Sequence, residues 1–120
     1  MKEIKVFEEA IKQTANNLKE LGINQTLFCA YRTSEEIGNE FIDFNDVIWD
    51  HDVEEIAHAL RANEITEFTI SSTCSNLIKT LAAFEKHGFS VAGLTTVKTS
   101  YIDFKTGEYA LISAIKMTVN

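Results

Sequence analysis

Residues 65–89 constrain the fold of this chain more than any other segment, because they predict a strand, a turn, a helix and a second strand in succession. Apolar alternation indicates a strand over residues 65–71, and an amphipathic pattern indicates a helix over residues 75–87. Gly88 then acts as the helix stop, and Phe89 opens the next strand. Such a unit implies parallel strands in one sheet, joined by a right-handed crossover through a helix that packs on the sheet.

Two further helices are predicted before this unit. Apolar residues recur at three- and four-residue steps from Ile4 to Leu21, which indicates a helix of about five turns ended by Gly22. Asp52 and Glu55 have the spacing of a capping box and would open another helix. The apolar stripe of that second helix comprises Val53, Ile56, Ala57 and Leu60.

The segment 25–38 allows two interpretations. Its apolar residues fit a helix ended by Gly38, but Leu27, Cys29 and Tyr31 also alternate as in a strand. The helix is the favoured interpretation, although a possible capping box later in the segment leaves its start open. Cys29 lies in an apolar run and is expected to be a core residue.

The rest of the chain predicts strands. Residues 41–44 read as a short strand, and two alternating runs on either side of Lys105–Gly107 read as a hairpin. The last strand is apolar on both faces and should be interior or lie at a subunit interface. We therefore predict one domain over residues 1–120 with an α/β (α+β) fold. Its single-layer mixed sheet has about four strands, carries helices packed on it and ends in an antiparallel hairpin.

The charge balance excludes some classes of partner. Eleven basic residues against eighteen acidic ones give a net charge of −7, and the acidic residues are spread along the chain. Nucleic-acid binding is disfavoured, because it needs a basic stripe to neutralise phosphates. The first residues lack the apolar core of a signal peptide, and no apolar run approaches the ~18 residues of a membrane span. We expect a cytoplasmic protein that does not bind membranes.

The turn before the helix at residues 75–87 is the first candidate site. It consists of Ser71, Ser72, Thr73, Cys74, Ser75 and Asn76. Amide groups at a helix N-terminus favour an anion, and the same field would make Cys74 a reactive thiol. These residue types are also ordinary helix caps, and the turn has no glycine where a phosphate would approach the backbone. The capping interpretation is favoured, with Cys74 as an ordinary thiol.

The acidic turn around residues 49–51 is the second candidate. Trp49, Asp50 and His51 could wall a ligand pocket, while Trp49 could instead close one end of the core, which is the favoured interpretation. Carboxylates and histidines occur near this turn, but no recognised spacing of metal ligands does. No metal site and no catalytic residue are predicted.

Two local sequences resemble known families. Phe84–Phe89 and the run Ala110–Met117 resemble the C-terminal part of the GNAT acetyltransferases, in which a helix ending in a similar sequence leads into the final strands. Those enzymes bind acetyl-CoA through a glycine-rich loop that has no counterpart in Ser71–Asn76, so no cofactor is predicted. Residues 38–98, through Gly38–Phe44 and Glu67–Ser72 among others, resemble a family of small uncharacterised proteins of Gram-positive bacteria. Members of that family are often carried on mobile genetic elements, and the resemblance implies a cytoplasmic accessory protein without a known activity.

The sequence has complete signals for secondary structure but no complete catalytic, metal or cofactor motif. This combination favours a non-enzymatic interaction module. It would bind a protein partner or form a homodimer, with the edge of the terminal hairpin as a candidate surface. One alternative is a small enzyme or a binder of an anion, nucleotide or CoA at Ser71–Asn76. Another alternative is an acidic mimic of nucleic acid.

Overall fold

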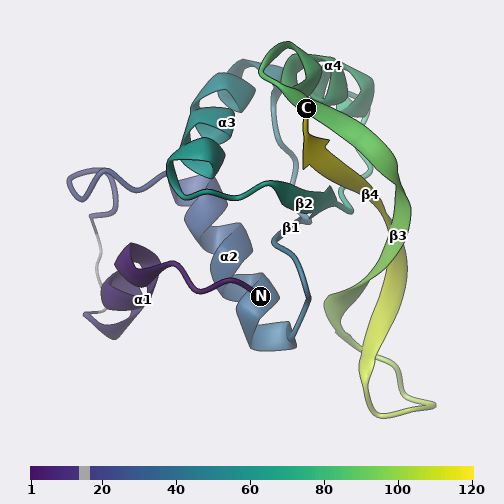
Figure 1. The fold of residues 1–120 in the computed structure, drawn as a ribbon. Coiled ribbons are helices and arrows are strands. Elements are labelled where there is room, and N and C mark those ends of the chain that lie inside the picture. The colour runs from purple at the N-terminus through teal and green to yellow at the C-terminus, as the bar shows by residue number, and fades with distance from the viewer. Residues whose placement is uncertain (14–16) are drawn as a thin grey trace.

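A four-stranded mixed sheet organises the fold in the computed structural model, which describes residues 1–13 and 17–120 (Figure 1). Its order is β1-β2-β4-β3. The strands are β1 (Asp43–Phe44), β2 (Glu67–Ile70), β3 (Phe89–Ile102) and β4 (Tyr109–Val119). The predicted fold class is confirmed, including the final antiparallel hairpin.

The pairing follows from two crossovers and a hairpin. β1 and β2 are parallel, while β4 is antiparallel to both β2 and β3. β3 therefore runs in the same direction as β2, and the place between them is taken by β4. The last strand is interior in the strand order, as predicted, and β1 and β3 are the edge strands. It is not covered on both sides, because Tyr109, Leu111 and Val119 are exposed.

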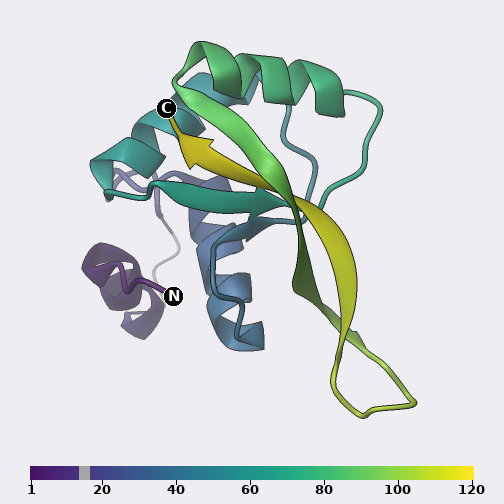
Figure 2. The same ribbon diagram turned by 45° about the vertical axis from the view of Figure 1, so that its right-hand side comes forward.

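Helices α3 (Val53–Ala62) and α4 (Leu77–Lys86) make the two crossovers and contact each other on one face of the sheet (Figures 1 and 2). Helix α2 (Gln25–Ile37) contacts α3, β1 and β3. Its helical interpretation is confirmed. The Asn24 side chain accepts a hydrogen bond from the Leu27 amide at the start, and Gly38 ends the helix with a φ of +79°.

The first helix is shorter than predicted. Helix α1 spans Lys5–Lys12, whereas Leu18 and Leu21 lie in turns beyond it. The Leu18 carbonyl accepts the Ile23 amide at 2.9 Å, and Gly22 has a φ of +72°. The chain therefore folds back here and brings Ile23 into the core. The predicted helical position at residue 15 lies outside the described residues.

The predicted capping box at Asp52 is wrong. A short 3-10 helix, η1 (Asp50–Asp52), precedes α3, so Asp52 already has helical backbone angles and its side chain makes no capping hydrogen bond. A capping side chain needs extended backbone at this position. The apolar stripe is confirmed, because all four of its residues are buried.

Aromatic rings fill the space between the sheet and the crossover helices. Phe68 of β2 contacts Phe44, Phe84 and Phe89, with ring centroids between 5.1 and 5.5 Å apart. All four rings are buried. Each such side chain contributes about 1.5–3 kcal/mol by burial, and each pair roughly 0.5–1.5 kcal/mol more. This cluster fixes α4 and the first residues of β3 on the sheet.

Two residues expected in the core are exposed. Cys29 lies on the solvent side of α2, because the buried face of that helix is set by Leu27, Phe28 and Tyr31. Trp49 is exposed as well, in extended backbone beside the buried Ile48. Neighbouring residues of an extended segment point in opposite directions, so only one of this pair can enter the core.

Candidate interaction surface

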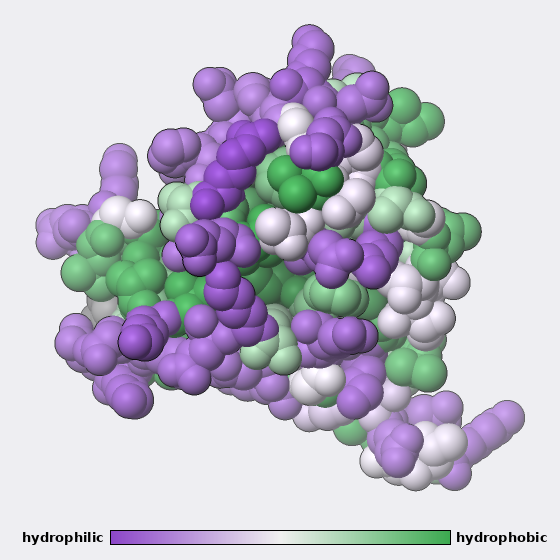
Figure 3. All heavy atoms as spheres, viewed as in Figure 1, coloured by the Kyte–Doolittle hydropathy of each residue, from purple (hydrophilic) through white to green (hydrophobic). Residues whose placement is uncertain are grey.

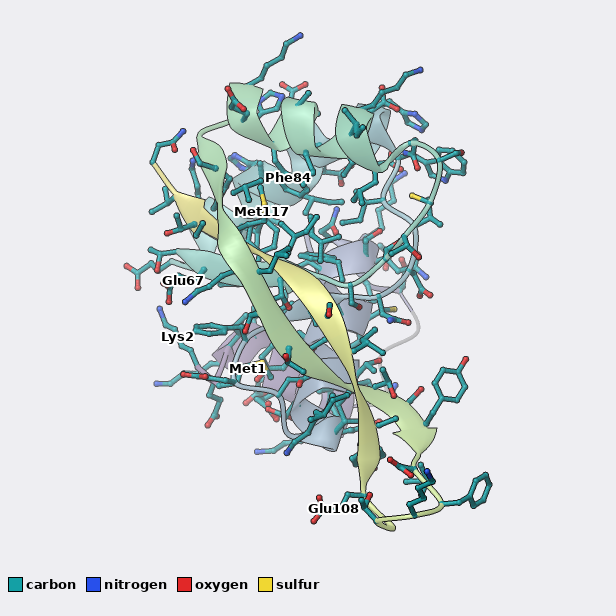
Figure 4. The ribbon with its side chains drawn as sticks, turned by 90° about the vertical axis from the view of Figure 1, so that its right-hand side faces the viewer. Met1, Lys2, Glu67, Phe84, Glu108 and Met117 are labelled. Carbon is teal, nitrogen blue, oxygen red and sulfur yellow. The ribbon has the colours of Figure 1, made fainter. Side chains whose placement is uncertain are left out.

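The outer half of the β3–β4 hairpin projects from the body of the molecule (Figures 2 and 4). We call residues 94–113 the arm. In Figure 4, Phe84 and Met117 lie inside near α4, whereas Glu108 lies at the far end of the hairpin. The arm therefore extends beyond the aromatic cluster and beyond the cover of α4.

The inner face of the hairpin continues along the arm. On β4, Leu111 lies on the same face as Ile115 and the buried Met117, because side chains alternate along a strand. Directly paired residues of antiparallel strands also share a face. Leu94 pairs with Ile115, and Ile102 pairs with Tyr109. Leu94, Ile102 and Tyr109 therefore lie on this inner face as well.

Beyond α4 the described part of the chain leaves this apolar face largely exposed. We call Leu94, Ile102, Tyr109 and Leu111 the arm face. Leu94 is 80% exposed, Leu111 64% and Ile102 49%, and Phe104 in the turn is fully exposed. Figure 3 shows hydrophobic side chains reaching the surface on the right-hand side, over β3 and β4. Contiguous exposed apolar side chains of this kind are typical of interaction sites.

A hollow of about 830 Å³ lies between the arm and the C-terminal end of α2. Its walls include Ile37 of α2, three residues of the arm face, and the charged residues Lys98, Asp103 and Glu108. Lys98 lies opposite Leu111, while the two carboxylates flank the turn beyond Ile102 and Tyr109. Along the arm, the wall of this hollow thus has a positive charge at its inner end, apolar side chains in the middle and negative charges at its outer end.

The backbone edge of β3 is partly closed. The Asn39 side chain donates to the Lys98 carbonyl at 3.1 Å and accepts from the Lys98 amide at 2.8 Å, as a neighbouring strand would. A bulge at Gly93 interrupts the ladder on the other side of this point. Capped edges and bulges hinder the addition of a further strand. Side chains of the arm, more than its backbone, are available to a partner.

The hairpin also differs from the rest of the chain in charge. Residues 89–119 carry three lysines and two carboxylates, whereas residues 1–88 carry eight basic and sixteen acidic residues. The acidic excess therefore belongs to the body of the molecule. A partner can approach the arm without crossing a strongly negative surface.

The sequence missed a buried carboxylate beside the first candidate site. Asp43 of β1 accepts hydrogen bonds from the Thr69 and Ser71 hydroxyl groups, both at 2.6 Å. Its own amide donates to the Ser34 hydroxyl at 2.9 Å. Ser71 and Ser72 are buried. The only signal in the sequence is one acidic residue within the apolar run 41–44.

The structure brings the two candidate sites next to each other. The Asn76 side chain and the Thr80 hydroxyl both donate to the Ile48 carbonyl, at 3.1 and 2.6 Å. The half-buried Cys74 thiol donates to the Asn76 side-chain oxygen at 2.7 Å. Asn76 precedes the first residue of α4 but makes no capping hydrogen bond, and Cys74 lies before the first helical turn.

The remaining predicted site residues face solvent. Thr73, Ser75, Trp49, Asp50 and His51 are exposed. The His51 ring nitrogen lies 3.7 Å from the carboxylate of its neighbour Asp52. Among the described residues no group of three metal-binding side chains occurs.

A second hollow, of about 400 Å³, lies at the C-terminal end of β1. The residues that line it include Cys29, Asp43, Asn45, Asp46 and Ser100. Both oxygens of the Asp43 carboxylate already accept hydrogen bonds from neighbouring hydroxyl groups. We assign this hollow no ligand.

The comparison with protein families gives one match. A family model described as "Domain of unknown function (DUF7698)" matches residues 26–119. The chain belongs to this family. The matched region of this DUF7698 domain includes the whole sheet, α3, α4 and the arm, and it leaves out α1. No curated protein and no solved structure matches the chain.

The match confirms the predicted resemblance at the level of an uncharacterised family. The likeness to acetyltransferases stays a prediction. None of the helices within residues 1–13 and 17–120 is long and apolar enough to cross a membrane.

Proposed function

We propose that this protein is a small non-enzymatic module that binds a protein partner through the arm face. It would act as an accessory protein in the cytoplasm of Gram-positive bacteria and be carried on mobile genetic elements. The observation that carries the proposal is the continuation of the core face of the hairpin into solvent at Leu94, Ile102 and Leu111.

The total accessible surface supports the same proposal. The chain exposes 7663 Å² at a mass of 13.5 kDa. A monomeric protein of this mass usually exposes about 6,500 Å². The excess of about 1,100 Å² is comparable to the ~800 Å² that each partner buries in a stable complex. Burial of the arm face on a partner would remove much of it.

A capture experiment tests the proposal. Tagged wild-type protein and the Leu94→Ser/Leu111→Ser variant would be incubated with bacterial lysate, and the retained proteins compared. We expect the variant to lose a specific partner, another protein or untagged copies of the chain itself, because two apolar contacts of the arm face are removed.

The matched control is Ile78→Ser. Ile78 is 81% exposed, close to the 80% of Leu94, but lies on α4 outside the arm. The control should retain the partner. Equal retention by all three proteins would contradict the proposal, as would the absence of any partner together with a monomeric wild type.

The alternative of an anion, nucleotide or CoA site at Ser71–Asn76 is weaker. The Asp43 carboxylate lies 2.6 Å from the Ser71 hydroxyl and would repel an anion there. A rise in melting temperature with added phosphate or CoA would favour this alternative. Mimicry of nucleic acid would instead use the acidic body, and retention of a DNA-binding protein by the arm variant would favour it.

A further inference from the structure

We propose that the partner of the arm face is a second copy of this chain, with the two arms packed face to face about a two-fold axis. This inference rests on the proposed function of the arm and names its partner. A two-fold interface requires a surface that is complementary to itself, so that each residue meets its counterpart in reciprocal fashion.

The charges on the arm have this property. Lys98 lies between Leu94 and Ile102 along the arm face, and Asp103 and Glu108 lie at its outer end. When two copies pack with their arms antiparallel, Lys98 of each copy faces the carboxylates of the other. Leu111 and Ile102 then meet near the axis. No salt bridge within residues 1–13 and 17–120 involves any of these three charged side chains. One oxygen of Asp103, Oδ1, accepts a hydrogen bond from the Lys105 amide at 2.9 Å.

The geometry favours packing of faces over pairing of edges. Asn39 already occupies the outward amide and carbonyl of Lys98, and the bulge at Gly93 distorts the neighbouring edge. A second irregularity in the register, between Lys98 and Ile102, distorts the outer part of the same edge. The side chains of the arm face have no such obstacle.

The available area also fits a dimer. The accessible surface of the chain exceeds that of an ordinary monomer of this mass by about 1,100 Å². Each copy in a standard interface buries ~800 Å², which is less than this excess. The near balance of charge in residues 89–119 lets two copies meet here despite a net charge of −7 on each.

The test is the mass of the protein in solution, measured by sedimentation equilibrium from micromolar to millimolar concentration. We expect wild type to form a dimer. Lys98→Glu and Glu108→Lys should each weaken it by roughly tenfold or more, because each places like charges opposite one another. An equimolar mixture of the two variants should recover dimers, since the contact between positions 98 and 108 is then attractive at both ends of the interface.

The recovery in the mixture separates this interface from any other. The Lys98→Glu/Glu108→Lys double variant should also dimerise, and circular dichroism would verify that each variant is folded. A wild type that stays monomeric throughout, or dimers that ignore the charge changes, would overturn the inference. If wild type is monomeric but the capture experiment still finds a partner that depends on Leu94 and Leu111, the proposed function stands and this inference alone fails.

Discussion

The Tyr31 hydroxyl group has one proton but two carboxylate neighbours. It lies 2.5 Å from Glu8 Oε1 and 3.0 Å from Glu35 Oε2, and it accepts a hydrogen bond from the Ile4 amide. The hydrogen bond to Glu8, together with burial, raises the pKa of Glu35, while the hydrogen bond from Tyr31 lowers the pKa of Glu8. Burial raises the pKa of Tyr31, so its proton stays in place. These three side chains hold α1 and α2 together best when Glu35 is protonated and Glu8 is ionised.

This arrangement predicts a dependence of stability on pH. A raised pKa in the folded state gives Glu35 a stabilising contribution at low pH that is lost as pH rises through that pKa. Glu8 does the opposite, and loses its contribution as pH falls through its lowered pKa. We expect Glu35→Gln, which resembles the protonated acid, to gain stability relative to wild type in urea unfolding as pH rises through the raised pKa of Glu35. Glu36→Gln, on the same helix, is the control, and a Glu35→Gln effect that does not change with pH would contradict the account.

The two cysteines should differ in reactivity. Cys29 is exposed on α2, whereas Cys74 is half-buried and hydrogen-bonded to Asn76. We expect Cys29 to be alkylated faster at neutral pH, because its thiol is more accessible to the reagent. Peptide mass spectrometry would give both rates. Faster alkylation of Cys74, slowed by phosphate, would instead indicate an anion site at residues 71–76.

Some residue roles could not be read from the sequence. Ser71 was predicted as part of a helix cap, but its hydroxyl binds Asp43, which lies 28 positions earlier in the chain. Cys29 and Trp49 were assigned to the core from apolar neighbours, although backbone direction turns both outward. Partners distant in sequence are set by the strand pairing, and local pattern does not determine that pairing.

At the scale of elements, apolar period and glycine stops predicted α2, α3 and α4 within a few residues. The same signal predicted too long a helix at α1, because Leu18 and Leu21 continue the helical period. In the structure these two residues lie in turns, one of which is closed by the hydrogen bond to the Leu18 carbonyl and by the positive φ of Gly22. The hairpin at Gly107 was also predictable, since alternation and turn residues are both local. The order β1-β2-β4-β3 was only partly predictable, as nothing local inserts β4 between β2 and β3.

The cap on the edge of β3 gives a prediction at this scale. Asn39→Ala removes both hydrogen bonds to Lys98 and leaves its amide and carbonyl without their partner. We expect a loss of about 1–3 kcal/mol in the free energy of unfolding. We also expect more aggregation, because a longer stretch of strand edge is free. Asn63→Ala, which removes one local hydrogen bond at the end of α3, is the control and should cost less. Equal stability of Asn39→Ala and wild type would contradict the capping role.

At the scale of the whole molecule, one hydrophobic cluster joins residues of all four α-helices and of the sheet. That cluster ends at Phe89 and Met117, and it contains no residue of the arm. The sequence could not show where the cluster ends, because apolar and polar residues alternate along β4 in the same way under α4 and beyond it. The central claim is therefore that the end of the arm serves association and contributes little to folding.

A variant with a short arm tests this claim most directly. Replacing residues 101–108 with Asn-Gly keeps Ser100 opposite Tyr109 in the register set by Lys98 and Leu111, and joins them by a two-residue turn. The measurement is the free energy of unfolding in urea, at a concentration low enough that association does not contribute. The account predicts a change within about 1 kcal/mol, because this segment contributes no buried residue. A loss of several kcal/mol would show that the arm belongs to the folded core and would contradict the account.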